Sequence, residues 1–215
     1  MADSYYQSRY TPSPDRSVVW PEVVRYLQPW LAGATTVLDL GAGYCDFVNN
    51  VSASRRLAVD YSSESAVHAA QGVEHIVSSA DDLSQVASAS VDVVFSSNLL
   101  EHLTEEQLDK TMNEVQRTLR PGGLFISMQP NYRLAYRTYF DDPTHRKVFS
   151  DVALRNFLLS HHFRIVREWP KFLPFSLASR PRLLPLSPLV VRAYLHSPWK
   201  PFAGQMLFIA ATGDR

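Results

Sequence analysis

The stretch "VLDLGAGYCDF", residues 37–47, decides the fold. Its apolar start is typical of a buried strand, and Gly41 and Gly43 then predict a tight turn. Residues 46–51 predict the start of a helix directly after that turn. A strand that passes through a glycine-rich turn into a helix is the opening unit of a doubly wound α/β sheet, whose ligands bind at the strand ends.

Short apolar segments and amphipathic segments alternate along the rest of the chain. Strands separated by helices imply right-handed crossovers and a parallel sheet that is covered on both faces. The sequence therefore predicts an α/β fold with a doubly wound, seven-stranded sheet. We expect strands at residues 35–40, 56–60, 73–79, 91–97, 124–130, 163–170 and 204–212, and helices at 18–31, 46–51, 62–70, 104–119 and 150–162.

Length and charge limit the classes of protein that fit. A chain of 215 residues with 46% hydrophobic residues predicts one domain spanning residues 1–215. Through Pro130 there are eight Lys or Arg against sixteen Asp or Glu, and afterwards thirteen against five. This asymmetry fits either a basic face that meets an anionic partner or two halves that pair with each other. The basic residues form no single run, so we expect no nucleic-acid binding.

The cysteine content and the apolar runs indicate a cytoplasmic protein. Cys45 is the single cysteine, so an intramolecular disulfide is impossible, and packing is its expected role. Residues 1–10 show neither the basic nor the apolar region of a secretory signal. No apolar run approaches the roughly 18 residues that a membrane span needs.

The residue at position 46 restricts the ligand of the glycine turn. A dinucleotide-binding fingerprint has a third glycine there, and its diphosphate rests on the start of the following helix. Asp46 would repel a diphosphate, and Asp39 adds a second negative charge at the strand tip. We therefore expect a nucleoside-like ligand with positive charge, and S-adenosylmethionine has both a sulfonium and an ammonium group.

Several motifs in order, "VLDLGAG", "LAVD", "SSADDLS", "VDVVFSSNLLEHL" and "LRPGG", resemble the class I S-adenosylmethionine-dependent methyltransferases. The branch that they resemble is the type 11 small-molecule methyltransferases. The resemblance extends over nearly the whole chain and implies a Rossmann-like sheet, mostly parallel with a reversed last strand. It also implies S-adenosylmethionine as cofactor. The alternatives are a nicotinamide-dependent enzyme and a catalytically silent protein that keeps the fold to bind a partner.

The resemblance assigns cofactor contacts residue by residue. Asp60 would accept hydrogen bonds from the ribose hydroxyls, and either Asp81 or Asp82 would accept the adenine amine. The alternative for Asp60 is a helix cap, and for the two later acids a solvated turn. The N-terminal tyrosines Tyr5, Tyr6 and Tyr10, with Trp20, would close over the cofactor. The expected contacts are Asp39, Gly41, Ala42, Gly43, Asp60, Tyr61, Ala80, Asp81, Asp82, Asn98 and Leu99.

Methyl transfer needs alignment of acceptor, methyl and sulfur, and an alcohol acceptor also gains from a general base. His102, within "LLEHL", is one candidate, although a structural or cofactor-facing role fits it equally. The stretch "YRTYFDDPTHRKVF", residues 136–149, gathers the others: Tyr136, Tyr139, Asp141, Asp142 and His145. His145, His102 and Asp141 are the catalytic candidates. Asp-Asp-Pro-Thr-His also has ligand chemistry for a divalent metal, but a turn or a capping cluster explains it too, and we expect no metal.

The last third of the chain is the expected acceptor side. We assign residues 18–130 to a cofactor-binding core, 131–203 to an acceptor-side loop, helix and cap, and 204–215 to the final strand. The cap holds the proline-rich connection of residues 170–201. With the basic residues Arg133, Arg137, Arg146, Lys147, Arg180 and Arg182, it favours an anionic or amphipathic small molecule. A sugar, a lipid-linked intermediate or a secondary metabolite with an oxygen nucleophile would fit. Contact between the leucine-rich cap and a membrane surface or a second subunit is a further alternative.

Overall fold

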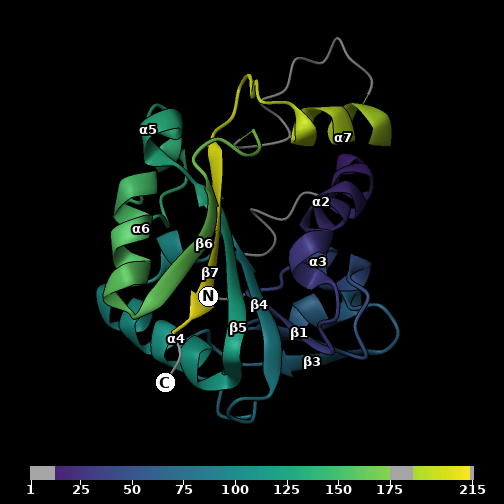
Figure 1. The fold of residues 1–215 in the computed structure, drawn as a ribbon, viewed down its shortest axis with the longest axis vertical. Coiled ribbons are helices and arrows are strands. Elements are labelled where there is room, and N and C mark those ends of the chain that lie inside the picture. The colour runs from purple at the N-terminus through teal and green to yellow at the C-terminus, as the bar shows by residue number, and fades with distance from the viewer. Residues whose placement is uncertain (1–12, 175–185, 214–215) are drawn as a thin grey trace.

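A seven-stranded sheet forms the centre of the computed structural model, which describes residues 13–174 and 186–213. The strand order is β3-β2-β1-β4-β5-β7-β6. β7 runs antiparallel to both β5 and β6, and the other pairs are parallel. The predicted α/β fold with a reversed last strand is confirmed (Figure 1). The strands are β1 (Thr36–Leu40), β2 (Arg55–Asp60), β3 (Val73–Val77), β4 (Val91–Ser97), β5 (Leu119–Pro130), β6 (Phe163–Trp169) and β7 (Gln205–Thr212).

The central strands are apolar on both sides because helices cover both faces. All five residues of β1 are buried, and Leu38 pairs with Leu57 of β2 on one side and with Val94 of β4 on the other. β1 and β4 are neighbours although β2 and β3 lie between them in sequence. At such a point the crossovers leave in opposite directions, so a crevice forms beyond the strand ends.

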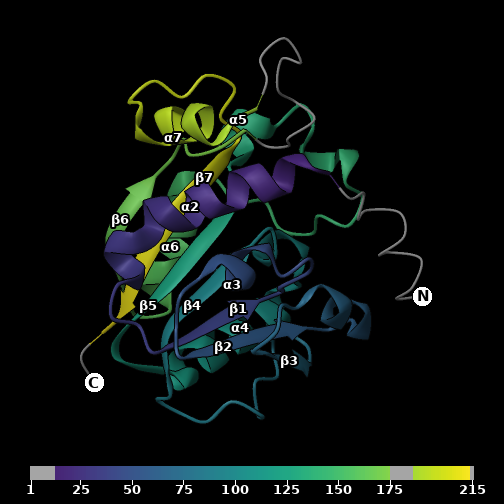
Figure 2. The ribbon, with the colours of Figure 1, turned by 90° about the vertical axis from the view of Figure 1, so that its right-hand side faces the viewer.

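Two helical layers sandwich the sheet. α2, α3 and α7 pack on one face, and α4 and α6 pack on the other (Figure 1). Figure 2 looks onto the first face, where α2 crosses in front of the strands with α7 beside it. The helical elements are α2 (Asp15–Leu31), α3 (Asp46–Asn50), η1 (Ser63–His68), η2 (Leu100–His102), α4 (Glu105–Thr118), α5 (Tyr132–Ala135), η3 (Tyr139–Asp141), α6 (Asp151–Ser160) and α7 (Pro188–His196).

Helix α4 begins as the sequence predicts. The Thr104 hydroxyl accepts from the amide of Gln107 at 3.3 Å, and the Gln107 side chain accepts from the Thr104 amide at 3.1 Å. This reciprocal cap satisfies two amides that a helix start leaves without partners. Leu108, Met112 and Val115 are wholly buried against the sheet, as their spacing indicates.

Several segments differ from the sequence prediction. β5 begins at Leu119, five residues before the predicted start, and the short elements η2, α5 and η3 were not predicted. Residues 62–70 do not form an α-helix but the short 3-10 helix η1, which the Ser62 side chain caps by accepting from the Glu64 amide at 3.2 Å. The proline-rich connection contains the helix α7, whose Pro188 occupies its first turn, where proline is tolerated. α7 packs on α2, and Arg192 forms two hydrogen bonds, of 2.8 and 2.9 Å, with the buried Glu22. In the described ranges no helix is long and apolar enough to cross a membrane.

Candidate active site

Backbone hydrogen bonds hold the turn after β1, and two glycines in it have positive φ. The amides of Gly41 and Ala42 both donate to the carbonyl of Val59, at 2.8 and 3.0 Å. Gly41 has φ of +72° and Gly43 of +50°, values that side chains other than glycine disfavour. A Cβ on Gly41 would stand 3.0 Å from a methyl of Leu99, the residue that we expect to line the cofactor. Leu99 therefore packs directly against the backbone of the turn at Gly41.

Asp60 ties this turn to the next one. Its Oδ2 accepts from the Gly43 amide at 2.8 Å, and its Oδ1 accepts from the Ser62 amide at 2.9 Å. Burial raises the pKa of Asp60, although these two amides favour its charged form. A carboxylate oxygen can accept more than one hydrogen bond, so hydroxyls of a ribose fit the same group.

Asp39 makes the centre of the turn acidic. It is 3% exposed and accepts from the Val48 amide at 3.3 Å. Burial, together with the smaller effect of the charges of Asp46 and Asp60, raises its pKa to about 8. A cationic ligand beside these carboxyls would relieve their mutual repulsion, whereas a diphosphate would add to it. The residues present therefore fit the sulfonium and ammonium groups of S-adenosylmethionine.

The role predicted for Asp46 needs a correction. Arg16 of α2 forms an ion pair with Asp46, and the Arg16 guanidinium also lies over the Tyr44 ring at 4.7 Å. Burial still raises the pKa of Asp46, but Arg16 opposes that rise and neutralises much of the charge. The acidic groups that remain for a ligand are consequently Asp39 and Asp60, and because burial raises the pKa of both, a cationic ligand would favour their charged forms. Arg16 lies thirty residues away in sequence, so the motif alone gave no sign of it.

The predicted adenine stretch follows β3. Ala80 is buried, Asp81 is half-buried and Asp82 is exposed. Asp82 accepts from the Ser84 amide at 3.1 Å, and Asp81 accepts from the Ser79 hydroxyl. Both acids also line an open depression of about 500 Å³ together with residues of α4. Asp81 is the less exposed of the two candidates.

Other predicted cofactor contacts lie around the end of β4. Asn98 has φ of +50°, and its side-chain oxygen accepts from Gln205 at 2.9 Å. Tyr61 is half exposed, and Trp20 packs edge-on against Phe95 within the layer of α2, with ring centroids 6.1 Å apart. The predicted cover over the cofactor also included Tyr5, Tyr6 and Tyr10, which lie outside the described residues.

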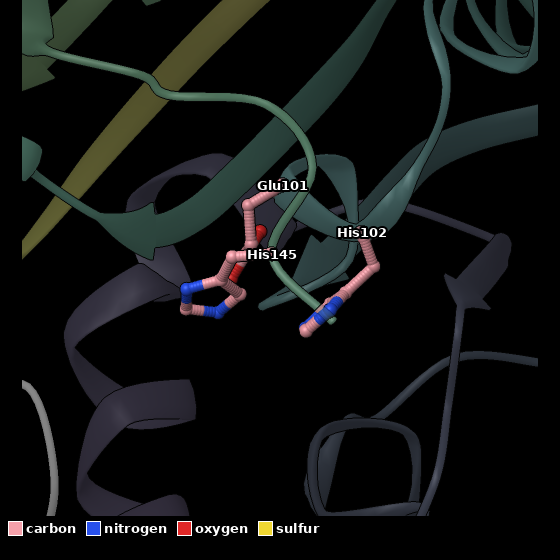
Figure 3. Close-up of side chains that lie close together, drawn as sticks. All are labelled: Glu101, His102 and His145. Carbon is pink, nitrogen blue, oxygen red and sulfur yellow. The ribbon is translucent and has the colours of Figure 1, made fainter. Parts of the chain in front are cut away.

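Two histidines far apart in sequence meet beyond β4. The amides of Arg146 and Lys147 both donate to the carbonyl of Glu101, at 2.8 and 3.0 Å, which fixes their loop against η2. The ring of His145 thereby comes to 4.8 Å from the ring of His102, centroid to centroid. Figure 3 shows these two side chains and Glu101 gathered in one place. The structure thus unites the two predicted sources of a base.

Hydrogen bonds fix the tautomer of both histidines. Nδ1 of His102 lies 2.9 Å from the Thr144 hydroxyl, whose proton goes to Asp142 at 2.7 Å, so Nδ1 is the donor. Nδ1 of His145 lies 2.5 Å from the carbonyl of Tyr139, and a carbonyl can only accept. Each ring therefore carries its proton on Nδ1 and its lone pair on Nε2.

Glu101 is a functional candidate that sequence reasoning missed. It is 1% exposed, and neither carboxylate oxygen has a hydrogen-bond partner among the described residues. Burial raises its pKa to about 8. The hydroxyl of Ser97 and the side-chain nitrogen Nε2 of Gln129, at the ends of β4 and β5, are likewise buried without a partner in the described chain. A lone charge inside the apolar run "NLLEHL" was the available signal.

The remaining predicted acceptor residues divide between core and surface. Tyr139 is wholly buried, and its hydroxyl donates to a backbone carbonyl at 2.6 Å. Tyr136 is 54% exposed, and Asp141 is exposed at the end of η3. The carboxylate near His145 is that of Asp142, with 3.8 Å between Oδ2 and Nε2.

The basic residues of this side lie at the surface. Arg146 is exposed. Three others contact neighbouring side chains: Arg133 with Asp151 at 3.5 Å, Arg137 with Tyr136, and Lys147 with Glu105. Arg180 and Arg182 lie outside the described residues.

Comparison with known proteins shows a family match in the first part of the sheet and a shared fold over most of the chain. The family model "Methyltransferase domain" of type 11 matches residues 38–127, from β1 into β5. A methyltransferase from Archaeoglobus fulgidus, described as S-adenosylmethionine-dependent, has a TM-score of 0.69 at 20% identity, covering 92% of this chain and 94% of that chain. A Thermotoga maritima protein described as a possible histamine N-methyltransferase has a TM-score of 0.66 at 15% identity, covering 92% and 91%. No match was found among curated proteins.

At these identities the solved structures show the fold, and the family model adds the activity of the matched region. Fold, motif order and the acidic turn agree with one another. Residues 38–127 match the type 11 methyltransferase domain model, and the described chain has the Rossmann-like fold of similar solved structures that are described as S-adenosylmethionine-dependent methyltransferases.

Proposed function

We propose that this domain transfers the methyl group of S-adenosylmethionine to an oxygen nucleophile on a small molecule. A sugar, a lipid-linked intermediate or a secondary metabolite fits the proposal. Such an acceptor hydroxyl must lose its proton as the oxygen attacks the methyl carbon, and an imidazole with a lone pair is a suitable proton acceptor.

One observation carries the proposal: the chain His102, Thr144, Asp142 that fixes the imidazole tautomer. His102 Nδ1 donates to the Thr144 hydroxyl, which in turn donates to the carboxylate of Asp142. The carboxylate stabilises the imidazolium that forms when Nε2 takes up a proton. An acceptor that needs no deprotonation, such as a carboxylate, would gain nothing from this arrangement.

The position of His102 relative to the cofactor turn supports the same proposal. Leu99 would touch a Cβ on Gly41, and the carbonyl of Leu99 accepts from the His102 amide at 3.0 Å. A single turn of chain thus links the cofactor side to the histidine pair. Methyl transfer requires direct contact between the acceptor and the methyl carbon, so the base must lie near the cofactor.

Exposed apolar side chains support an amphipathic acceptor. Leu189 on α7 is 71% exposed, and Trp199 and Phe202, which follow α7, are 76% and 66% exposed. With the nearby basic residues they suit an anionic head attached to an apolar body. Contact of α7 with a membrane surface belongs to this proposal. Flotation with anionic vesicles, compared between the wild type and Trp199→Ser, tests it.

The test of the proposed function uses S-adenosylmethionine labelled at its methyl group. The protein is incubated with this cofactor and extracts of the source cell, and the labelled product is identified by mass and fragmentation. We expect the label on oxygen. His102→Gln should lower the rate roughly 10²- to 10⁴-fold, as loss of a general base does. His161→Gln, which changes a partly buried histidine that lies 3.1 Å from Asp109 and outside the histidine pair, should leave the rate unchanged.

Two results would refute the proposal. A label on nitrogen or carbon would show a different acceptor class. No labelled product in any extract, although S-adenosylmethionine binds, would favour the catalytically silent alternative.

A further inference from the structure

We propose that Glu101, His102 and His145 bind one divalent transition-metal ion of the Zn²⁺ class. Each residue offers one ligand atom, and these atoms all lie within 4.8 Å of one another. Two imidazoles and one carboxylate suit zinc and its first-row neighbours, whereas Mg²⁺ and Ca²⁺ prefer oxygen ligands alone. The same three side chains are drawn in Figure 3.

The first support is the carboxylate of Glu101. It is 1% exposed, and its two oxygens accept no hydrogen bond from any other residue that the structure describes. Buried polar groups in folded proteins almost always have a partner, and a buried carboxylate without one is costly. A bound cation supplies both the missing contact and the missing charge.

The second support is the set of groups around the imidazoles. Metal-bound histidines usually donate their other ring N–H to a carbonyl or to a group tied to a carboxylate, which orients the ring. Nδ1 of His145 donates to the carbonyl of Tyr139, and Nδ1 of His102 donates to Thr144, which donates to Asp142. Both rings thus present Nε2 as the nitrogen with the lone pair.

The backbone holds the ligands near the required geometry. In a tetrahedral zinc site, ligand atoms lie roughly 3.3 Å apart, so separations of up to 4.8 Å here have to shorten by at most about 1.5 Å. Side-chain rotation of Glu101 and His102 can supply this change, while the His145 ring stays in place through the hydrogen bond from its Nδ1 to the Tyr139 carbonyl. Three protein ligands also leave at least one coordination position for another molecule.

The role of the metal rests on the proposed function. With the metal bound, Nε2 of His102 would be a ligand and no longer the proton acceptor. An acceptor hydroxyl bound at the open position would then lose its proton to solvent more easily, because the cation stabilises the alkoxide. The alkoxide oxygen then forms a bond with the methyl carbon, the carbon–sulfur bond breaks, and its electron pair stays on sulfur in S-adenosylhomocysteine. Cofactor, acceptor and one released proton account for all atoms and charges.

Metal binding can be measured without any acceptor. The full chain without an affinity tag is freed of metal by dialysis against a chelator and titrated with Co²⁺, whose visible absorption reports nitrogen and oxygen ligands. Competition by Zn²⁺ against a coloured chelator then gives the affinity. Cys45 will not interfere, because it is wholly buried and burial raises the pKa of its thiol to about 12.

Three variants and the wild type are compared. We expect one equivalent of Co²⁺ per wild-type chain, with an affinity at least about 100-fold lower in Glu101→Gln and His145→Gln, which lose a direct ligand. His161→Gln is the matched control, because it also lies beside a carboxylate, and it should bind as the wild type does. If Glu101→Gln fails to fold by circular dichroism, His102→Gln, whose side chain is less buried, takes its place.

The proposal is overturned if the wild type binds Co²⁺ and Zn²⁺ no more tightly than Glu101→Gln, or if His161→Gln loses as much affinity as His145→Gln. Failure here and failure of the proposed function are distinguishable. Methylation of an oxygen acceptor by metal-free protein would leave His102 as a simple base. Metal binding with label on nitrogen or carbon would keep the metal site and remove its proposed role.

Discussion

Comparing Gly41→Ala with Gly33→Ala separates the cost of backbone strain from the cost of crowding against Leu99. Gly41 and Gly33 both have positive φ, +72° and +84°, and an alanine in this region costs roughly 1–2 kcal/mol at either place. A Cβ on Gly33 meets nothing within 4 Å, whereas one on Gly41 stands 3.0 and 3.2 Å from the two Leu99 methyls. Crowding of that kind adds about 1–3 kcal/mol. Gly41→Ala should therefore be the more destabilising change by about that amount.

The same pair of variants reports on the cofactor. In Gly41→Ala the new methyl pushes Leu99 toward the expected position of the methionyl group, so the affinity for S-adenosylmethionine should fall by roughly tenfold or more, about 1.4 kcal/mol. Gly33→Ala, which lies after α2 and away from the turn, should bind the cofactor as the wild type does. Urea unfolding gives the stabilities, and isothermal titration gives the affinities. Equal cofactor affinities in Gly41→Ala and Gly33→Ala would refute the placement of the ligand at this turn.

Three further predictions concern charged residues that the structure buries. Asp60→Asn replaces one acceptor oxygen by a donor NH₂ group, which then faces the amide of either Gly43 or Ser62. We expect the binding free energy of S-adenosylmethionine in isothermal titration to weaken by about 1–3 kcal/mol. Unchanged affinity would count against the ribose role of Asp60. The pKa of Asp39 is about 8 in the folded protein, against 3.8 in the unfolded chain. The folded state therefore binds the proton of Asp39 more tightly, and the free energy of unfolding falls as the pH rises from 3.8 toward 8. The slope is at most about 1.4 kcal/mol per pH unit. Asp39→Asn should remove this part of the slope in urea unfolding between about pH 5 and 8, and identical slopes in both proteins would disprove it. Arg192→Met leaves the buried Glu22 without its two strongest hydrogen bonds, so the melting temperature should fall, and a temperature equal to that of the wild type would show that α7 is held to α2 by apolar contacts alone.

The sheet could be predicted from sequence because local patterns and long-range packing agree there. β1 is apolar throughout, since both of its faces are covered, and Thr104 with Gln107 marks the start of α4. The prediction of an α-helix at η1 was wrong, because periodicity cannot distinguish an α-helix from a 3-10 helix in a segment of only six residues. α7 was missed because prolines dominate its surroundings, although Pro188 sits where a helix accepts proline.

The candidate site could be predicted only where a motif contains the whole interaction. Asp60 bonds to Gly43 within seventeen residues, and both belong to recognisable motifs. The pairing of Arg16 with Asp46 depends on how α2 crosses the sheet, which no local pattern reveals. Glu101 was not predicted for the same reason, because only the folded structure shows that its carboxyl group is buried without a hydrogen-bond partner from another described residue.

Parallel isothermal titrations with S-adenosylmethionine and with NAD⁺ test the central claim most directly. The claim is that the turn holding Asp39 and Asp60 accepts a cationic adenosyl ligand and rejects a diphosphate. We predict one S-adenosylmethionine bound per chain, weakened by Asp60→Asn, and no measurable binding of NAD⁺. Tight binding of NAD⁺ without binding of S-adenosylmethionine would contradict the claim and the methyl-transfer function derived from it.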